Sequence, residues 1–296
     1  MRNQRRLMRA LALLGLLACA AATAAQAAPR QMSRLEQEHL RETRARYAQE
    51  NWPLGAVRSG LANDLALRGW AAGELSSAEG LLTRSFRRAA DEKAPPSFVL
   101  ETRVEDDARA AHERLLGWLA GVQSAQRMPS TTEAGLFVGD AGFVGRSGAG
   151  PRALAWIAFV RGNVAVRVSA FDAPREPELE LGAIAAEVDA AIVAAPALEA
   201  GRAPARPVIS DLRAERATVV AGTPLRLDVA LADPARGRAH LQWVVAGAGQ
   251  GYVEQEPSGE WRFHPTAPGR VTLALEATGS TGTWSRREIA VDVLDD

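Results

Sequence analysis

The side chains best suited to nucleophilic chemistry are Ser147, within a glycine-rich run, and His112. A serine nucleophile needs a histidine base and a third group that orients the imidazole, all brought together by geometry. Arg146 precedes the serine, and Ala149 stands where a nucleophile elbow requires glycine. The spacing indicates no third partner. We therefore interpret the run around Ser147 as a flexible hairpin loop, and we predict no catalytic residue.

The histidines and carboxylates form no metal-binding pattern. Position 116 is leucine, where a zinc motif beginning at His112-Glu113 would need a second histidine, and no two histidines are four residues apart. Asp140, in a Gly-Asp-Ala-Gly run, is interpreted as a turn residue, with a ligand-binding role as the alternative. Glu254 and Glu256 are explained by the exposed face of one strand. We predict neither a metal site nor a cofactor.

Aromatic side chains in the last third of the chain are the remaining candidates for recognition. Tyr252, Trp261 and Trp284 are candidate binding residues, whereas Trp243 is predicted to lie in a core. Trp284 follows a run of glycine, serine and threonine, where an exposed aromatic ring needs a packing partner or a ligand. Packing is the preferred interpretation for Trp284, and binding of a glycan or a protein is the alternative.

The first 28 residues, Met1–Ala28, have the pattern of an export signal. Four arginines precede an apolar run, and Ala25-Gln26-Ala27 fits the small-x-small site of signal peptidase. Cys19 allows a second interpretation, because Leu16-Leu17-Ala18-Cys19 resembles the lipobox of bacterial lipoproteins. Acylation of Cys19 would anchor the chain to a membrane. Cleavage after Ala27 is the preferred prediction, which places the protein in the periplasm or outside the cell.

Composition excludes several function classes. The 296 residues carry 35 basic and 35 acidic side chains, so no basic excess indicates nucleic-acid binding. Lys93 is the only lysine, which argues against Schiff-base and P-loop chemistry. No apolar run after the leader is long enough to span a membrane. Cys19 is the only cysteine, so the folded part cannot form a disulfide.

The elements that must position these residues fall into three regions. The first, Gln31–Ala94, is predicted to be polar and helical, with helices over Arg34–Asn51, Ser59–Gly73 and Ser76–Ala90. Ala94-Pro95-Pro96 is interpreted as a boundary.

The second region, Ser97–Pro196, is predicted to be an α+β domain, an antiparallel sheet with packed helices. A strand from Phe98 to Val104 precedes a helix capped by Asp106, a further strand is expected over Leu136–Val144, and a last helix begins near Leu181.

The best local signal in this region is a hairpin. Ala153–Val160 and Val164–Phe171 flank Gly162-Asn163, a two-residue turn able to take positive φ at both positions. Two pairs are predicted for one face, Phe159 with Val166 and Ile157 with Val168. The mixed face is predicted to hold Ala158 opposite Arg167 and Trp156 opposite Ser169.

The chain then changes character. Ala195–Pro207 is rich in proline and alanine and is predicted to be a stiff linker. Within Val208–Asp296, alternating apolar residues predict strands of a β-sandwich at Leu225–Leu231, Leu241–Val245, Trp261–Phe263, Val271–Ala277 and Ile289–Val293.

Three motifs carry a resemblance in this last region. Ala-Gly-Thr-Pro-Leu at 221–225, Leu-Gln-Trp at 241–243 and Pro-Gly-Arg-Val-Thr-Leu at 268–273 together resemble bacterial immunoglobulin-like or PKD-type modules. The resemblance covers the C-terminal third and implies an immunoglobulin-like sandwich. Residues 31–196 resemble no family.

These observations favour an exported, non-enzymatic envelope protein that binds another envelope protein or a polysaccharide through its β-sandwich. One alternative is an exported hydrolase or glycan-active enzyme with a cleft lined by Asp140, His112 or Ser147. A second alternative is a subunit of an envelope complex, lipid-anchored through Cys19.

Overall fold

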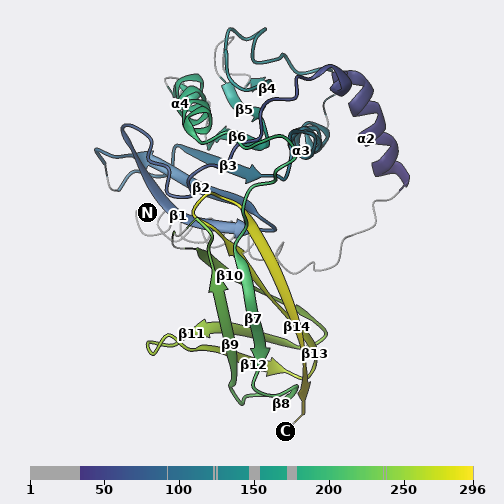
Figure 1. Cartoon of the computed structure of the whole chain (residues 1–296), viewed down its shortest axis with the longest axis vertical. Helices are drawn as coiled ribbons and strands as arrows, with labels where there is room; N and C mark the ends of the chain where they lie inside the picture. The colour runs from purple at the N-terminus through teal and green to yellow at the C-terminus, as the bar shows by residue number, and fades with distance from the viewer. Residues whose placement is uncertain are drawn as a thin grey trace, which may run out of the picture.

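The protein is mainly antiparallel β-sheet with a few helices, arranged as three sheets (Figure 1). The computed structural model describes residues 34–91, 93–122, 124, 126–146, 154–171, 179–235, 237 and 239–295. The predicted export signal, Cys19 and Ser147 lie outside these residues.

The first sheet has six strands in the order β1-β2-β3-β6-β5-β4, with every neighbouring pair antiparallel. Its strands are β1 (Trp70–Ala78), β2 (Leu81–Arg88), β3 (Phe98–Val104), β4 (Ala141–Arg146), β5 (Leu154–Arg161) and β6 (Val164–Ala170).

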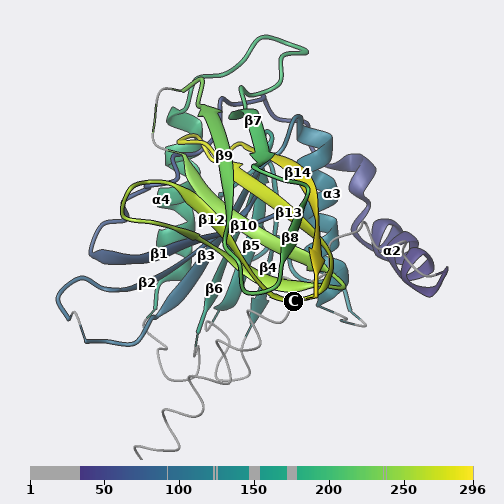
Figure 2. The ribbon, with the colours of Figure 1, turned by 90° about the horizontal axis from the view of Figure 1, so that it is seen from below.

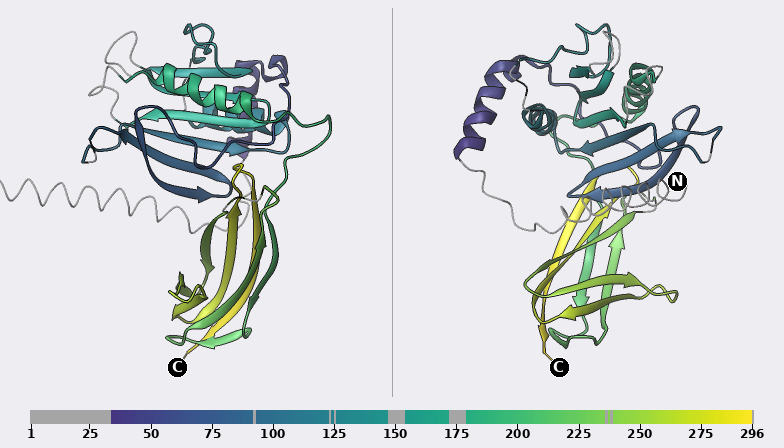
Figure 3. Two further views of the ribbon diagram at one scale, coloured as in Figure 1. Left: turned by 60° about the vertical axis from the view of Figure 1, so that its left-hand side comes forward. Right: turned by 180° about the vertical axis from the view of Figure 1, so that it is seen from behind.

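Two helices cover opposite faces of this sheet, as Figures 1 and 3 show. Helix α4 (Leu181–Ala194) shares a buried cluster with Phe159, whereas α3 (Ala108–Gly121) shares another with the adjacent Ala158. Successive strand residues point to opposite faces, so the two clusters lie on either side of the sheet. Helix α2 (Arg34–Tyr47) packs on α3, and a 3₁₀ turn, η2 (Gln49–Asn51), follows it.

The predicted β5–β6 hairpin is confirmed, including its register. Phe159 pairs with Val166, Ile157 with Val168, Ala158 with Arg167 and Trp156 with Ser169. The turn differs in one respect, because only Gly162 has a positive φ, of 55°. The buried Asn163 side chain instead joins neighbouring segments. It accepts from the Arg58 amide at 2.7 Å and donates to the Glu105 carbonyl at 2.9 Å.

The prediction of helices over Ser59–Gly73 and Ser76–Ala90 is wrong. Residues 59–69 form no regular element, and β1 and β2 form a hairpin after them. Its turn has Glu79 and Gly80 at φ 50° and 76°, the primed geometry that suits a two-residue hairpin. Leu82 and Phe86 are both buried, and Phe86 belongs to the same buried cluster as the α4 residues. This burial outweighs the helix propensity of the segment. The sheet therefore continues across Ala94-Pro95-Pro96.

Smaller boundaries also differ from prediction. The side chain that caps α3 is Asp107 rather than Asp106, and it accepts from the Ala110 amide at 2.8 Å. The first predicted helix ends at Tyr47, where Ala48 adopts a left-handed conformation and η2 takes over. Strand β4 begins at Ala141, so the strand predicted from Leu136 is a loop over its first residues.

The other two sheets have four strands each and form the C-terminal sheet pair, which Figure 2 shows from below. One has the order β10-β13-β14-β8: β8 (Thr218–Val220), β10 (His240–Gly247), β13 (Gly269–Thr278) and β14 (Trp284–Leu294). The second has the order β11-β12-β9-β7: β7 (Val208–Ala214), β9 (Leu225–Ala232), β11 (Gln250–Gln255) and β12 (Trp261–Ala267). All five predicted strands are present.

The sheet pair encloses a shared core. Leu225 and Phe263 of one sheet belong to the same buried cluster as Leu273 and Val291 of the other. Only β8 and β14 pair in parallel; every other strand pair recorded for these two sheets is antiparallel.

The six-stranded sheet meets the sheet pair at the β1–β2 turn. The hydroxyls of Ser77 and Thr278, both buried, are 2.9 Å apart. The Glu79 amide donates to the buried Glu276 carboxylate at 2.8 Å, and Arg286 donates to the same carboxylate at 2.9 Å. The Ser77–Thr278 contact crosses the junction between two side chains, and the Glu79–Glu276 bond crosses it from main chain to side chain.

Candidate functional site

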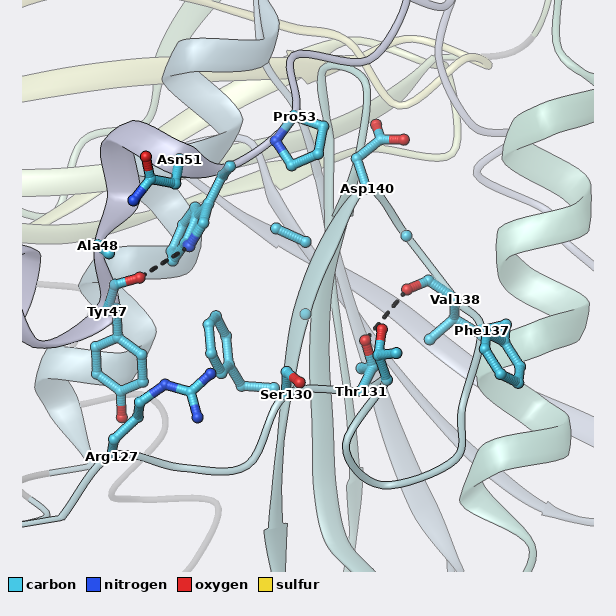
Figure 4. A pocket seen from close by; sticks show the side chains of 16 residues that line it. Tyr47, Ala48, Asn51, Pro53, Arg127, Ser130, Thr131, Phe137, Val138 and Asp140 are labelled. Carbon is cyan, nitrogen blue, oxygen red and sulfur yellow. Dashed lines mark hydrogen bonds between the residues drawn. The ribbon is translucent and has the colours of Figure 1, made fainter.

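Two hollows flank Trp52, in the chain that leads from α2 toward β1. The first, of about 390 Å³, includes Phe143 among its lining residues and is called the Phe143 pocket (Figure 4). The second, of about 410 Å³, includes His112 and is called the His112 pocket. The Trp52 indole N–H donates to the Tyr47 carbonyl at 3.1 Å, which fixes the ring between the two hollows.

The Phe143 pocket has an aromatic wall. The Tyr47 and Trp52 rings lie 4.8 and 5.5 Å from the Phe143 ring, and the Arg127 guanidinium lies 5.8 Å above it. The Phe137 side chain, at the rim, is 86% exposed. Such a surface suits a ligand with an apolar or planar part.

The charged groups of this pocket are occupied by protein partners. Arg127 makes two hydrogen bonds to Glu133, at 3.0 and 2.9 Å. Hydrogen bonds from the Ser130 amide and hydroxyl, and then from Arg127, lower the pKa of Glu133 to about 2. The Asp140 carboxylate lies across the pocket from Tyr47 (Figure 4). It accepts from Arg161 at 2.8 Å and from the Gly162 amide at 2.6 Å.

Asp140 therefore joins the start of β4 to the end of β5 and to the β5–β6 turn. Arg161 also donates to both carboxylate oxygens of Asp189 on α4, at 2.8 and 2.7 Å. The hydrogen bond with Asp189 is the main reason that the pKa of Arg161 is raised. A carboxylate bound in this way already uses both oxygens, so it is a poor general base.

The His112 pocket contains a buried imidazole. His112 is 4% exposed, and its ring meets the edge of Trp52 at 5.4 Å. Burial lowers its pKa, against the opposing effect of a hydrogen bond with the Pro53 main chain. Burial works to raise the pKa of Glu113, but hydrogen bonds from Arg44 and Gln49 outweigh it and lower that pKa. His112 is thus neutral near pH 7, with a charged neighbour that is already paired.

The structure does not bring the two described polar candidates into one hydrogen-bonded group. Asp140 lines the Phe143 pocket, and His112 lines the other. Within the described ranges, no group of three histidine, cysteine, aspartate or glutamate side chains could hold a metal ion. None of the described helices is both long and apolar enough to cross a membrane.

The aromatic candidates of the sheet pair lie in three different settings. Tyr252 is 52% exposed on β11, and its ring stacks on His264 at 4.9 Å. Trp261 is half-buried and packs against the shared core, 5.8 Å from Trp243. Trp284 lies at the junction with the six-stranded sheet, where a Cβ on Gly80 would be 2.1 Å from its ring. Tyr252 is therefore the most accessible of the three.

The two edges of the sheet that contains Tyr252 differ. At the β7 edge, Arg287 of β14 donates to the carbonyls of Ile209 and Ser210, at 3.0 and 2.9 Å. In the described part of the chain, no side chain hydrogen-bonds to the β11 main chain, which pairs only with β12. The β11 edge can therefore accept another strand.

Sequence reasoning missed the Phe143 pocket. Its residues come from the end of α2, the segment after it, the loop before β4 and the start of β4, and most of these segments have no hydrophobic periodicity. A usable signal was the aromatic pair Tyr47 and Trp52 at the end of a polar helix, which indicates a packing surface there.

Comparison with known proteins identifies no family for this chain. No family model matches, and no curated protein matches. One solved structure is described as a nucleoside hydrolase-related hypothetical protein from Saccharophagus degradans that is associated with carbohydrate metabolism. It is 16% identical with a TM-score of 0.24, over 41% of this chain and 33% of that one. The matched part is a third of that protein's length, and such a low score carries no argument.

Proposed function

We propose that this chain is an exported, non-enzymatic protein of the bacterial envelope that binds a partner protein through its C-terminal sheet pair. In this proposal, residues 208–296 are an immunoglobulin-like sandwich, and the six-stranded sheet with its helices is an α+β unit. The basic, apolar and small-residue pattern of Met1–Ala28 supports export. Two four-stranded sheets around one core support the sandwich.

The free β11 edge is the observation that carries the proposal. An edge strand presents unpaired N–H and C=O groups to which an extended segment can add. The other edge of the same sheet is occupied by Arg287. The partner is therefore an extended segment that pairs with Gln250–Gln255.

Side chains beside this edge define the chemistry of that segment. Tyr252 provides an exposed ring, already ordered by its stacking on His264. The Glu254 side chain is 61% exposed and lies 4.0 Å from the His264 imidazole. Glu256 and Glu260 are both paired with Arg262. A basic residue on the added strand would meet Glu254, so the edge favours a segment with an arginine or lysine.

Site-specific photo-crosslinking in cells of the source organism tests this proposal. A benzophenone amino acid is placed at Tyr252 and, as the matched control, at Val208, which is also 52% exposed but lies on the β7 edge. We expect one dominant envelope-protein adduct from position 252 and none from position 208. Equal adducts from both positions, or none from 252, would contradict strand addition at β11.

Charge reversal sharpens the test. With the crosslinker at Gln250, Glu254→Lys should reduce the adduct severalfold, because it repels a basic segment. Glu288→Lys, at another exposed glutamate of the sheet pair, is the control and should leave the yield unchanged. An adduct that a glycosidase removes would instead identify a polysaccharide as the partner and contradict the protein assignment.

A further inference from the structure

A third hollow, of about 270 Å³, lies on the face of the six-stranded sheet that α3 covers. Trp118 and Gly117 of α3 line one side, and Trp156, Arg167 and Ser169 of β5 and β6 line the other. We call it the tryptophan pocket. It shares no lining residue with the Phe143 or His112 pocket, and it lies outside the sheet pair.

Strand register positions Trp156. On its two sides the residue pairs with Gly145 of β4 and Ser169 of β6. A Cβ on Gly145 would lie 2.1 Å from the Trp156 Nε1 and 2.3 Å from the next ring carbon. The indole therefore lies across the backbone of β4 in space that only glycine leaves open.

The charged group in the pocket is neutralised and fixed. Arg167 lies between Glu101 of β3 and Ala158 of β5 in one cross-strand row. Glu101 accepts two hydrogen bonds from its guanidinium, one of them at 2.7 Å. The guanidinium also lies 5.3 Å from the centre of the Trp118 ring. This pair adds polar groups to the pocket without a net charge, so it does not select an ion.

Among the described residues, several hydrogen-bonding groups beside the rings have no protein partner. Within the described residues, the indole N–H groups of Trp118 and Trp156 and the hydroxyl of Ser169 make no recorded hydrogen bond. Two indole N–H donors and one serine hydroxyl therefore lie next to two aromatic rings in the pocket.

Glycine leaves the α3 side of the tryptophan pocket without a side chain at two positions. A Cβ at Gly117 or Gly121 would meet nothing within 4 Å, so close packing does not require glycine at either position. Glycine weakens a helix interior, and Gly117 is within α3. Its effect here is to leave room above the strands.

We propose that the tryptophan pocket binds one ring of a neutral sugar. The axial C–H groups of a pyranose form an apolar face that packs on an indole, whose ring face carries negative potential. Its hydroxyls can accept from the indole N–H groups and exchange hydrogen bonds with Ser169 and the Arg167–Glu101 pair. A cation would be repelled by Arg167, and an anion would find that charge already matched.

The indole N–H signals of the ¹⁵N-labelled full chain provide the test. The probes are the methyl glycosides of glucose, galactose and N-acetylglucosamine, and Trp118→Phe and Trp156→Phe assign the two signals. We expect saturable shifts of both signals with at least one of these sugars. Gly145→Ala keeps both tryptophans but displaces Trp156, and it should weaken binding by roughly tenfold.

Trp70→Phe is the matched control, because Trp70 also has an arginine over its ring, Arg88 at 5.2 Å, but lies outside the pocket. It should change the affinity by less than about twofold. The absence of a saturable shift with all three sugars would overturn the proposal. So would a shift caused by N-acetylphenylalanine amide and by none of the sugars, since that result would identify a plain apolar site.

Discussion

The two faces of the six-stranded sheet use the same strands in opposite ways. The face under α4 is a continuous apolar layer that includes Phe98, Ile157, Phe159 and Val166. The face under α3 mixes small, charged and aromatic side chains, and three hollows open along it or beside it. Alternate residues of one strand can therefore supply stability on one side and a binding surface on the other.

The largest effect should come from the apolar face. Phe159→Ala removes a fully buried ring and should destabilise the fold by about 3–5 kcal/mol. Urea denaturation followed by circular dichroism measures the loss. The control is the adjacent Ala158→Gly on the other face, which removes one methyl group and should cost roughly 1 kcal/mol. Similar losses of unfolding free energy for the two variants would contradict the proposed difference in stability between the two faces.

Glu101→Gln tests the charged row under α3. The variant leaves the partly buried Arg167 without its anion, and the expected loss is about 1–2 kcal/mol. Denaturation in low and high salt measures it, because the ion pair is screened only in part. The surface pair Arg41 and Glu38 is the control, and Glu38→Gln should change stability by less than about 0.5 kcal/mol.

Gly117→Ala should separate stability from binding. Alanine has the higher helix propensity and meets no atom at this position, so the fold should gain about 0.5–1 kcal/mol. The same methyl group narrows the tryptophan pocket, so sugar binding should weaken. A variant that binds sugar as the wild type does would show that the helical side of the pocket is not used.

The smallest effect is a dependence on pH. Burial lowers the pKa of His112 below its usual 6.5, so the folded state favours the neutral ring. The unfolded chain takes up the proton first as the pH falls, and stability is lost below about 6.5. His112→Gln should flatten the stability profile between pH 7 and 5. His240, whose pKa is also lowered by burial, keeps its own contribution in that variant.

Local signals accounted for the hairpin and for the strands of the sheet pair. The Gly162-Asn163 turn and the alternation on each side of it were enough to predict the register of β5 and β6. The signal works because turn chemistry and hydrophobic period agree there.

The β1–β2 hairpin could not be predicted in the same way. Its segment contains good helix formers, and it becomes strand because Leu82 and Phe86 are buried against a sheet contributed by later residues. The Glu79-Gly80 turn was the one local sign of a hairpin. Long-range burial of this kind overrides propensity.

The pockets depend on contacts that the sequence does not reveal. The mixed face of the β5–β6 hairpin was predicted, but the partner of Arg167 was not, because Glu101 lies on a strand whose neighbour was unknown. Tyr47 and Phe143 likewise meet only once α2 packs beside β4. Spacing along the chain carries no information about such pairs.

The bonds across the β1–β2 turn limit how this gene can be recombined. Separation of the sheet pair from the preceding residues at 195–207 would leave the amides of Ser77 and Glu79 without Gln242 and Glu276, and would expose the surface that Trp284 covers. The sheet pair is therefore not an interchangeable unit that can be moved between proteins at its linker.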